Sequence, residues 1–519
     1  MSSFESLVRS ATVGLGARPL DREALPPRIA RTLSHPADGD ALPRGGAGRD
    51  AALALDAAAA YALVHRVGIE SAATTAVTLP SSSRQPVPDR LSSLLSTLMA
   101  DAGQHSLLCA VLRFVRDRGM AVAPRQAAAL LGGHIRRGYD ELVLGVMDER
   151  AAAALADHPK WGVYARRAAL CGGPFDRDAW DDGDCLGRLF CYRRLRAQDP
   201  RLSREFLTPE TLRKQAADRR AEFVWAIGTG LSPADEPLLE KALEDSKENV
   251  RKAATVMLCR LDGSALVRQA EDAVRRHVTV ERGPVRQTRI ACTPLEPGEI
   301  DARYRLDASL GVPRQFEPTA GRLMKAMICV PTGRWKGLIG ITASEMLQAQ
   351  AAYDGEPMDL EWTLGRAAWN WHDAALAAEL FARDPTNVEM VALMEERRRE
   401  EIILDALESG DTPRISDMAR HMPEAWTPRL SLAVARTIAR HAPTGRSQTA
   451  SAHQARAFHN LSGLLAALPT ACAPKAVPEA LAALDSIAVE GQPAHRLDAA
   501  VKGLALRASF LTIVDQETT

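Results

Sequence analysis

The stretch DEPLLEKALEDSKENVRKAATVMLCRLDGSALVRQA, residues 235–270, decides the fold class. A Ser-Pro pair at 232–233 precedes it, and these residue types favour the cap and the first turn of a helix. Apolar residues at helical spacing form one stripe before and one stripe after the polar segment EDSKEN at 244–249. Glycine and serine at 263–264 end the second helix and cap a third. The stretch therefore predicts a helical hairpin followed directly by another helix.

The second helix of this hairpin resembles the inner helix of a HEAT repeat. Asp245 precedes a Val-Arg pair at 250–251, and the small residue Ala254 follows one turn later. In HEAT repeats this aspartate and this arginine commonly bond between neighbouring units, so the resemblance implies that Asp245 and Arg251 are ladder residues. A solvated charged turn in an isolated helical hairpin is the alternative interpretation of the same residues.

Helical patterns flank this unit on both sides. A Thr-Pro-Glu helix start lies upstream at 208–210, and proline-marked starts lie downstream at 427–428 and 477–478. One hairpin cannot bury its hydrophobic face alone, whereas a stack of hairpins buries a continuous core. We therefore predict an all-α protein, a HEAT/ARM-like α-solenoid with helix at about two-thirds of its residues, against the usual third.

Proline and glycine divide this array into three parts. Residues 1–279 are expected to form an N-terminal helical-repeat region that contains the HEAT-like unit at 233–277. The segment 280–340 begins with a Pro/Gly-rich stretch and is predicted to be a non-helical insertion or a small β element. A C-terminal helical region is expected over 341–519.

Charge and cysteine usage narrow the classes of protein. Lys plus Arg and Asp plus Glu number 65 each, so no net field draws the chain to nucleic acid or to an anionic membrane. The eight cysteines are dispersed and include no CxxC pair, as expected of reduced thiols in a cytosol. The start of the sequence lacks a leader pattern, and nowhere do eighteen apolar residues run together. We expect a cytoplasmic protein that does not span a membrane.

The sequence carries no familiar catalytic motif: it has no Gly-rich phosphate loop, no HExxH and no GxSxG. His372 and Asp373 are adjacent, but adjacent helical residues point about 100° apart, and we expect Asp373 to cap the next helix instead. His158 and Trp161 are interpreted as a turn with an aromatic plug. We therefore predict no catalytic residue, no cofactor and no metal, and an enzyme is the less favoured class.

A local excess of positive charge supports an alternative. Residues 247–290 hold ten Lys or Arg against five acids, although no aromatic residues are interleaved to suggest base stacking. Some HEAT-like proteins grip DNA along such a surface and some remove damaged bases, so a nucleic-acid-binding protein or a DNA-repair glycosylase is the alternative function. Lys247, Lys252 and Arg260 are the candidate partner-binding residues in either case, and Arg251 remains the ladder residue.

The chain also resembles a bacterial domain-of-unknown-function family with HEAT-like repeats. Three segments carry the resemblance: LVRSATVGLGARPL near the N-terminus, LVLGVMDERAAAALADHPKW at 142–161, and the stretch at 235–266. The chain departs from the family pattern at 145–150, where GVMDER replaces a Gly-x-Arg-Gly-like run. Genes of this family lie near those for MoxR-type AAA+ ATPases, von Willebrand factor A proteins and SWIM zinc-finger proteins. The resemblance implies a non-catalytic scaffold or adaptor in an ATPase-driven assembly, with those proteins as partners.

Overall fold

The structure is a computed structural model of the chain. It describes residues 79–133, 139–172, 177–283, 288–311, 320–442, 448–485 and 492–518, together with the single residues 58, 175 and 487. The chain divides into two compact units, residues 1–78 and 79–519, and all described residues except Ala58 belong to the second. The N-terminal segment of the family resemblance lies outside the described residues. Helix makes up 70% and strand 5% of the structure, which confirms the prediction of a mostly helical protein.

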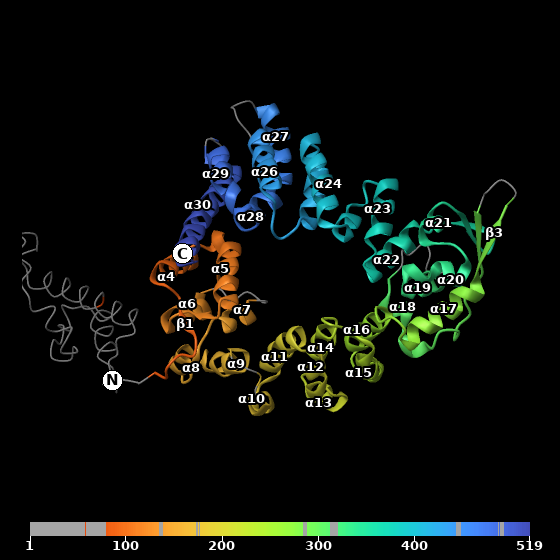
Figure 1. Ribbon diagram of the computed structural model, residues 1–519, viewed down its shortest axis with the longest axis horizontal. Coiled ribbons are helices and arrows are strands. Elements are labelled where there is room, and N and C mark those ends of the chain that lie inside the picture. The colour runs from red at the N-terminus through yellow and green to blue at the C-terminus, as the bar shows by residue number, and fades with distance from the viewer. Residues whose placement is uncertain are drawn as a thin grey trace, which may run out of the picture. The chain divides into compact units, whose positions relative to one another are not determined.

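The first part of the second unit is a succession of short helices (Figure 1). The α-helices are α4 (Asp89–Met99), α5 (His105–Asp117), α6 (Pro124–Gly133), α7 (Asp140–Gly145), α8 (Glu149–Leu155), α9 (Gly162–Gly172), α10 (Arg177–Asp182), α11 (Cys185–Gln198), α12 (Pro200–Phe206), α13 (Pro209–Lys214), α14 (Arg220–Ala226), α15 (Glu236–Ala242), α16 (Glu248–Cys259) and α17 (Ala265–His277). Two 3₁₀ turns, η1 (Ala102–Gln104) and η2 (Pro233–Asp235), and a parallel pair of two-residue strands, β1 (Gln85–Pro86) and β2 (Met120–Ala121), lie between them.

The predicted helical hairpin is confirmed as α15 and α16, which pack against each other. Its caps follow from residue type. Gly263 adopts φ +73°, a left-handed conformation that favours glycine, in the turn between the end of α16 and the start of α17. Ser264 then accepts a hydrogen bond at 3.1 Å from the backbone N–H of Val267, so it caps α17 as predicted. The Ser-Pro pair at 232–233 starts the 3₁₀ turn η2, and the regular helix begins at Glu236.

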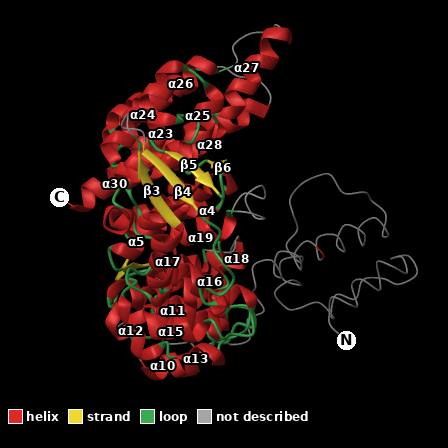
Figure 2. Cartoon of the chain, turned by 90° about the vertical axis from the view of Figure 1, so that its right-hand side faces the viewer, coloured by secondary structure: helices red, strands yellow, loops and turns green. Residues whose placement is uncertain are grey.

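A four-stranded mixed sheet follows α17 (Figure 2). Its strands are β3 (Val278–Arg282), β4 (Thr288–Cys292), β5 (Gln350–Tyr353) and β6 (Glu356–Met358), in that order across the sheet. The β3–β4 and β5–β6 pairs are antiparallel, and β4 pairs with β5 in parallel. The β5–β6 turn is Asp354-Gly355 with positive φ at both residues, the geometry that such a two-residue hairpin turn needs.

The segment 280–340 is therefore more helical than predicted. The strands β3 and β4 fit the expected small β element, but three helices lie beyond them in this segment: α18 (Leu306–Ser309), α19 (Gly321–Cys329) and α20 (Trp335–Ile339). Two 3₁₀ turns, η3 (Ala302–Tyr304) and η4 (Thr332–Arg334), accompany them. The prediction followed the Pro/Gly-rich composition of the start of this segment, whereas α19 is a core helix in which eight of the nine residues are buried.

The remaining chain is helical apart from β5 and β6. Its α-helices are α21 (Ala343–Leu347), α22 (Glu361–Trp371), α23 (Ala374–Arg383), α24 (Glu396–Ser409), α25 (Thr412–Met418), α26 (Pro428–His441), α27 (Gln448–Asn460), α28 (Ser462–Ala471), α29 (Val477–Asp485) and α30 (Gln492–Thr518). The 3₁₀ segments η5 (Val388–Leu393), η6 (Ala419–His421) and η7 (Pro474–Ala476) connect them. Thr427 caps α26 with a 3.1 Å bond from Leu430, as its Thr-Pro start predicts.

Most helices pack against near neighbours in the chain, for example α14 on α16, α17 on α19, α19 on α22 and α24 on α26. Within this unit the last helices also contact the first described ones: α28 packs against α5, and α30 packs against α4 and α5 (Figure 1). Gln104 donates a 2.9 Å bond to the carbonyl of Ala499, and the rings of Phe114 and Phe510 meet edge to face at 5.2 Å. The last helix is therefore part of the core that surrounds the first described helices.

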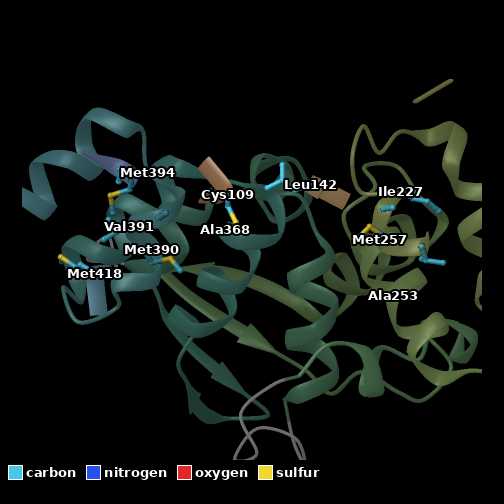
Figure 3. Close-up of a cluster of buried hydrophobic side chains, with 14 of the residues drawn as sticks. Cys109, Leu142, Ile227, Ala253, Met257, Ala368, Met390, Val391, Met394 and Met418 are labelled. Atoms are coloured by element: carbon cyan, nitrogen blue, oxygen red, sulfur yellow. The ribbon is translucent and has the colours of Figure 1, made fainter. Parts of the chain in front are cut away.

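Buried apolar side chains run through the whole unit. Figure 3 shows Met257 beside Ile227 and Ala253, where α16 packs against the end of α14. Methionines fill a second part of the core around η5, namely Met390, Met394 and Met418. A flexible thioether can fill the irregular space that 3₁₀ and short helical segments leave between them.

Candidate protein-interaction site around helix α16

Helix α16 has one buried and one charged face. Its buried residues are Val250, Ala253, Ala254, Thr255, Met257, Leu258 and Cys259, and they face α14, α15 and α17. The small side chains of Ala253 and Ala254 allow these helices to approach closely. The candidate partner-binding residues lie off this buried stripe, so the packing of α16 determines which cations reach the surface.

Asp245 is held in the turn between α15 and α16 by an arginine from the helix pair before it. Its carboxylate accepts bonds from Arg220 Nε at 2.7 Å and from Arg220 Nη2 at 2.9 Å, and a third from the backbone N–H of Lys247 at 2.8 Å. Both charged side chains are largely buried, with 11% of Arg220 and 7% of Asp245 exposed. This bidentate pair links α14 to the α15–α16 turn.

The pKa of Asp245 reflects two opposing causes. Burial raises the pKa, but the hydrogen bonds donated by Arg220 and by the backbone N–H of Lys247 favour the charged form and outweigh it. The pKa of Asp245 is therefore lowered below its ordinary value, and the ion pair is intact at neutral pH.

Arg251 bonds to the backbone of Asp245, whereas a ladder arginine is expected to bond between neighbouring units. Its Nη1 donates to the backbone carbonyl of Asp245 at 2.5 Å, and its Nε is buried without a hydrogen-bond partner. Asp245 and Arg251 are thus brought together, but the carboxylate itself bonds to Arg220. The sequence interpretation missed Arg220. The feature that could have pointed to it is its position in the first turn of the preceding helix, 25 residues before Asp245.

The three candidate partner-binding cations are spread along α16 from its N-cap to its C-cap. Lys247 is exposed at the N-cap, and Lys252 is 43% exposed and pairs with Glu248 at 2.8 Å one turn away. Arg260 is exposed at the C-cap, where it has no ion-pair or hydrogen-bond partner among the residues that the structure describes. Lys252 and Arg260 are eight residues apart, or about 12 Å along the helix axis. Lys247 likewise has no side-chain partner among the described residues, so the charges of Lys247 and Arg260 are more available to a partner than that of Lys252.

An exposed tryptophan lies on the neighbouring helix. Trp225 of α14 is 46% exposed and is the single large hydrophobic residue so exposed within the described ranges. Helix α14 packs directly on α16, and Ile227, which follows α14, is buried beside Met257 (Figure 3). The sequence interpretation did not single out Trp225, because an exposed and a buried tryptophan look alike in an apolar helical pattern.

Comparison with models of protein families assigns this chain to a family. A model described as a family of unknown function, DUF5691, matches residues 6–513. The chain belongs to this family. Neither the curated proteins nor the solved structures include a significant match. The family description assigns no activity, so the roles of Trp225 and of the α16 cations must be argued from geometry.

His372 and Asp373 occupy helix ends. Asp373 accepts a 3.0 Å bond from the backbone N–H of Leu376 and caps α23, as predicted. His372 ends α22 with φ +51°, a left-handed conformation, and its side chain is exposed. The two side chains are placed by the turn between helices, so the capping interpretation of Asp373 is confirmed.

His158 likewise serves a helix start. Its Nδ1 accepts from the backbone N–H groups of Lys160 and Trp161, both at 3.2 Å, and its ring stacks on Trp161 with centroids 4.0 Å apart. This is the turn with an aromatic plug that the sequence predicts. Within the described ranges, no group of three or more His, Cys, Asp or Glu is placed to hold a metal ion. Nor is any helix there both long enough and apolar enough to cross a membrane.

Proposed function

We propose that this chain is a non-catalytic helical-repeat scaffold that binds a protein partner across α14 and α16. The observation that carries the proposal is Trp225, 46% exposed on a helix that packs against α16. Removing an indole from water is a large gain in binding, and tryptophan is among the residues most enriched at the energetic centres of protein interfaces. The cations of α16 would then form the charged margin of the same surface.

The linkage through Asp245 supports a HEAT-like solenoid as the architecture of this scaffold. The Arg220–Asp245 pair joins one helix pair to the turn of the next, and Arg251 fixes that turn through the Asp245 carbonyl. Such bonds between units are what a stack of repeats needs, because each unit contacts mainly its neighbours. Asp245 and Arg251 remain our ladder residues in this proposal, with Arg220 added.

The chemistry of the surface suggests an acidic partner. Lys247, Lys252 and Arg260 would attract a negatively charged protein surface and speed its association. The resemblance to proteins encoded near MoxR-type AAA+ ATPases, von Willebrand factor A proteins and SWIM zinc-finger proteins makes these the first partners to test. A cytoplasmic location fits this assembly and fits the cysteines, which form no disulfide among the described residues.

The test is a binding measurement with the MoxR-type ATPase and the von Willebrand factor A protein encoded nearest to this chain. We expect Trp225→Ala to weaken binding of the true partner by about 2 kcal/mol or more, roughly thirty-fold. Reversal of Lys252 and Arg260 to Glu should also weaken binding while leaving the melting temperature nearly unchanged. A matched reversal of Arg429 and Arg440, exposed cations of α26 without a bonded partner among the described residues, is the control and should have little effect.

Two outcomes would contradict the proposal. If neither protein binds and purification from the native host yields no protein partner, the scaffold assignment fails. If nucleic acid co-purifies instead and its affinity falls steeply between two salt concentrations, the alternative of a HEAT-like nucleic-acid-binding protein or DNA-repair glycosylase replaces it, because each phosphate contact releases counterions.

A further inference from the structure

Arg260 borders a pocket of 120 Å³ between the HEAT-like unit and the C-terminal helices. The pocket walls come from the end of α16, the residues after α18, the end of α19, and α22. Its polar side chains include Arg260, Arg366, Ser309, Trp369 and Asn370, and none of the described residues that line it is acidic. Three segments that are distant in the sequence, at the ends of α16 and α18 and in α22, therefore bring hydrogen-bond donors to one place.

No described acidic residue pairs with the two guanidinium groups of this pocket. Neither Arg260 nor Arg366 has an ion-pair or hydrogen-bond partner in the part of the chain that the structure describes. Arg334 nearby shows the usual arrangement, since it pairs with Asp262 and with Glu271, each at 2.6 Å. Two unpaired cations at one pocket produce a local positive field that favours an anion.

Two other polar groups of the pocket are buried without a partner. Trp369 Nε1 and Ser309 Oγ are almost inaccessible to solvent and have no hydrogen-bond partner among the described residues, so a small side-chain shift would bring each to a ligand in the pocket. An unsatisfied buried polar group costs about 1–3 kcal/mol, so such groups are rare unless something outside the chain satisfies them. Trp369 can only donate and Ser309 can donate, so an acceptor is the complement that both lack.

The wall of the pocket is fixed by bonds on its far side. Asn370 Nδ2 donates to the carbonyl of Cys259 at 2.9 Å and to that of Ile328 at 3.3 Å, and Trp371 Nε1 donates to Ile328 at 3.2 Å. These bonds tie α22 to the ends of α16 and α19. The backbone positions of Arg366 and Trp369 on α22 are therefore set by the core.

We propose that this pocket binds a small oxyanion, a phosphate or a carboxylate, through Arg260 and Arg366 with Trp369 and Ser309 as neutral donors. A volume of 120 Å³ has room for an anion of a few heavy atoms. Both guanidiniums can make paired, charge-assisted bonds to such an anion. The proposal stands on these contacts alone and does not depend on the protein partner proposed above.

The test is titration calorimetry of the full chain with inorganic phosphate and, separately, with acetate, each against sodium chloride of equal ionic strength. We expect saturable binding of at least one oxyanion and none of chloride. The double variant Arg260→Ala/Arg366→Ala should weaken it by about ten-fold or more, as the loss of charge-assisted bonds implies. Trp369→Phe keeps an aromatic ring and removes the N–H donor, so it should weaken binding less than the double variant.

Control variants keep the test decisive. Arg429→Ala/Arg440→Ala removes two exposed arginines outside the pocket and should leave anion affinity unchanged, and circular dichroism checks that each variant is folded. Binding of phosphate alone would identify a phosphoryl group as the ligand, and binding of acetate alone would identify a carboxylate. The proposal is overturned if neither oxyanion binds more tightly than chloride, or if the folded Arg260→Ala/Arg366→Ala variant binds as the unmodified chain does.

Discussion

Arg196 and Asp235 form a fully buried bidentate ion pair, with Nη2–Oδ2 at 2.6 Å and Nη1–Oδ1 at 2.9 Å. The arginine side chain is completely buried, and only 1% of the aspartate side chain is exposed. The guanidinium also donates to backbone carbonyls of the turn that precedes α15, those of Ile227, Thr229 and Gly230. One side chain of α11 therefore holds in place the segment that leads into the α15–α16 hairpin.

Replacing Asp235 should be among the most destabilising single changes in the chain. Asp235→Ala leaves the Arg196 charge buried and unpaired, and loss of one partner of a buried pair costs about 3–5 kcal/mol. Urea unfolding followed by circular dichroism measures the difference. The double variant Arg196→Met/Asp235→Leu removes both charges and should recover part of this loss, so a double variant as unstable as Asp235→Ala would contradict the explanation.

The hydrogen bonds of Asp245 and Arg251 predict that replacing them causes unequal losses of stability. Asp245→Ala removes the bonds from Arg220 and Lys247 and should destabilise the fold by about 1–3 kcal/mol. Arg251→Ala removes one bond to a backbone carbonyl and should cost less within the same range. Thermal melting of both variants, with Lys247→Ala as an exposed control, compares them. An Arg251 variant less stable than the Asp245 variant would reverse the assigned roles.

The stabilisation by Asp245 should depend on pH in one direction. Its pKa in the folded chain is lower than in the unfolded chain, so the contribution is complete above the unfolded value, about 3.9, and is lost as the pH falls through the folded value. The difference in melting temperature between the unmodified chain and Asp245→Asn should therefore be constant above about pH 5 and shrink below about pH 4. A difference that grows on acidification would refute this account.

Two substitutions in the turn between α22 and α23 should change the stability of the fold in opposite directions. Asp373→Ala should cost about 1 kcal/mol because the cap of α23 is lost, and Asp373→Ser should restore most of it. His372→Gly should stabilise the fold by up to about 1 kcal/mol, since φ +51° strains a residue with a Cβ atom. Melting temperatures of the three variants decide both. Loss of partner binding by folded variants would show that these residues form a site.

Gly503 tests the packing of the last helix on the first described ones. A Cβ atom there would lie 2.7 Å from Gln104 Oε1 and 2.7 Å from Pro469 Cγ, so Gly503→Ala must displace α30. We expect a net loss of stability, because overpacking costs about 1–3 kcal/mol and exceeds the gain of about 1 kcal/mol in helix propensity. Gly463→Ala in α28 is the control, since its nearest contact would be an ordinary 3.5 Å to Ala419. Equal melting temperatures for the two variants would mean that α30 is not tightly docked.

Local chemistry was enough to predict several elements from the sequence. The caps at Ser264, Thr427 and Asp373 and the left-handed Gly263 follow from bonds and backbone conformations within a few residues. The turn residues Asp354-Gly355 are also a local signal for the hairpin β5–β6. The predicted C-terminal helical region, which begins at 341, nevertheless included them, and this prediction was wrong for these two strands. A strong helical pattern on both sides outweighed a two-residue turn.

By itself, then, the sequence determined the helical class, the α15–α16 hairpin and its capping residues, because each depends on neighbours within one or two turns. Only the tertiary structure decided which groups meet across long separations: Arg220 with Asp245, Arg196 with Asp235, and Arg260 with Arg366 at one pocket. The physical reason is that an arginine has the same local pattern whether it is paired, buried or free. Its partner is fixed by how the helices pack, and that packing is the sum of many apolar contacts that no short segment contains.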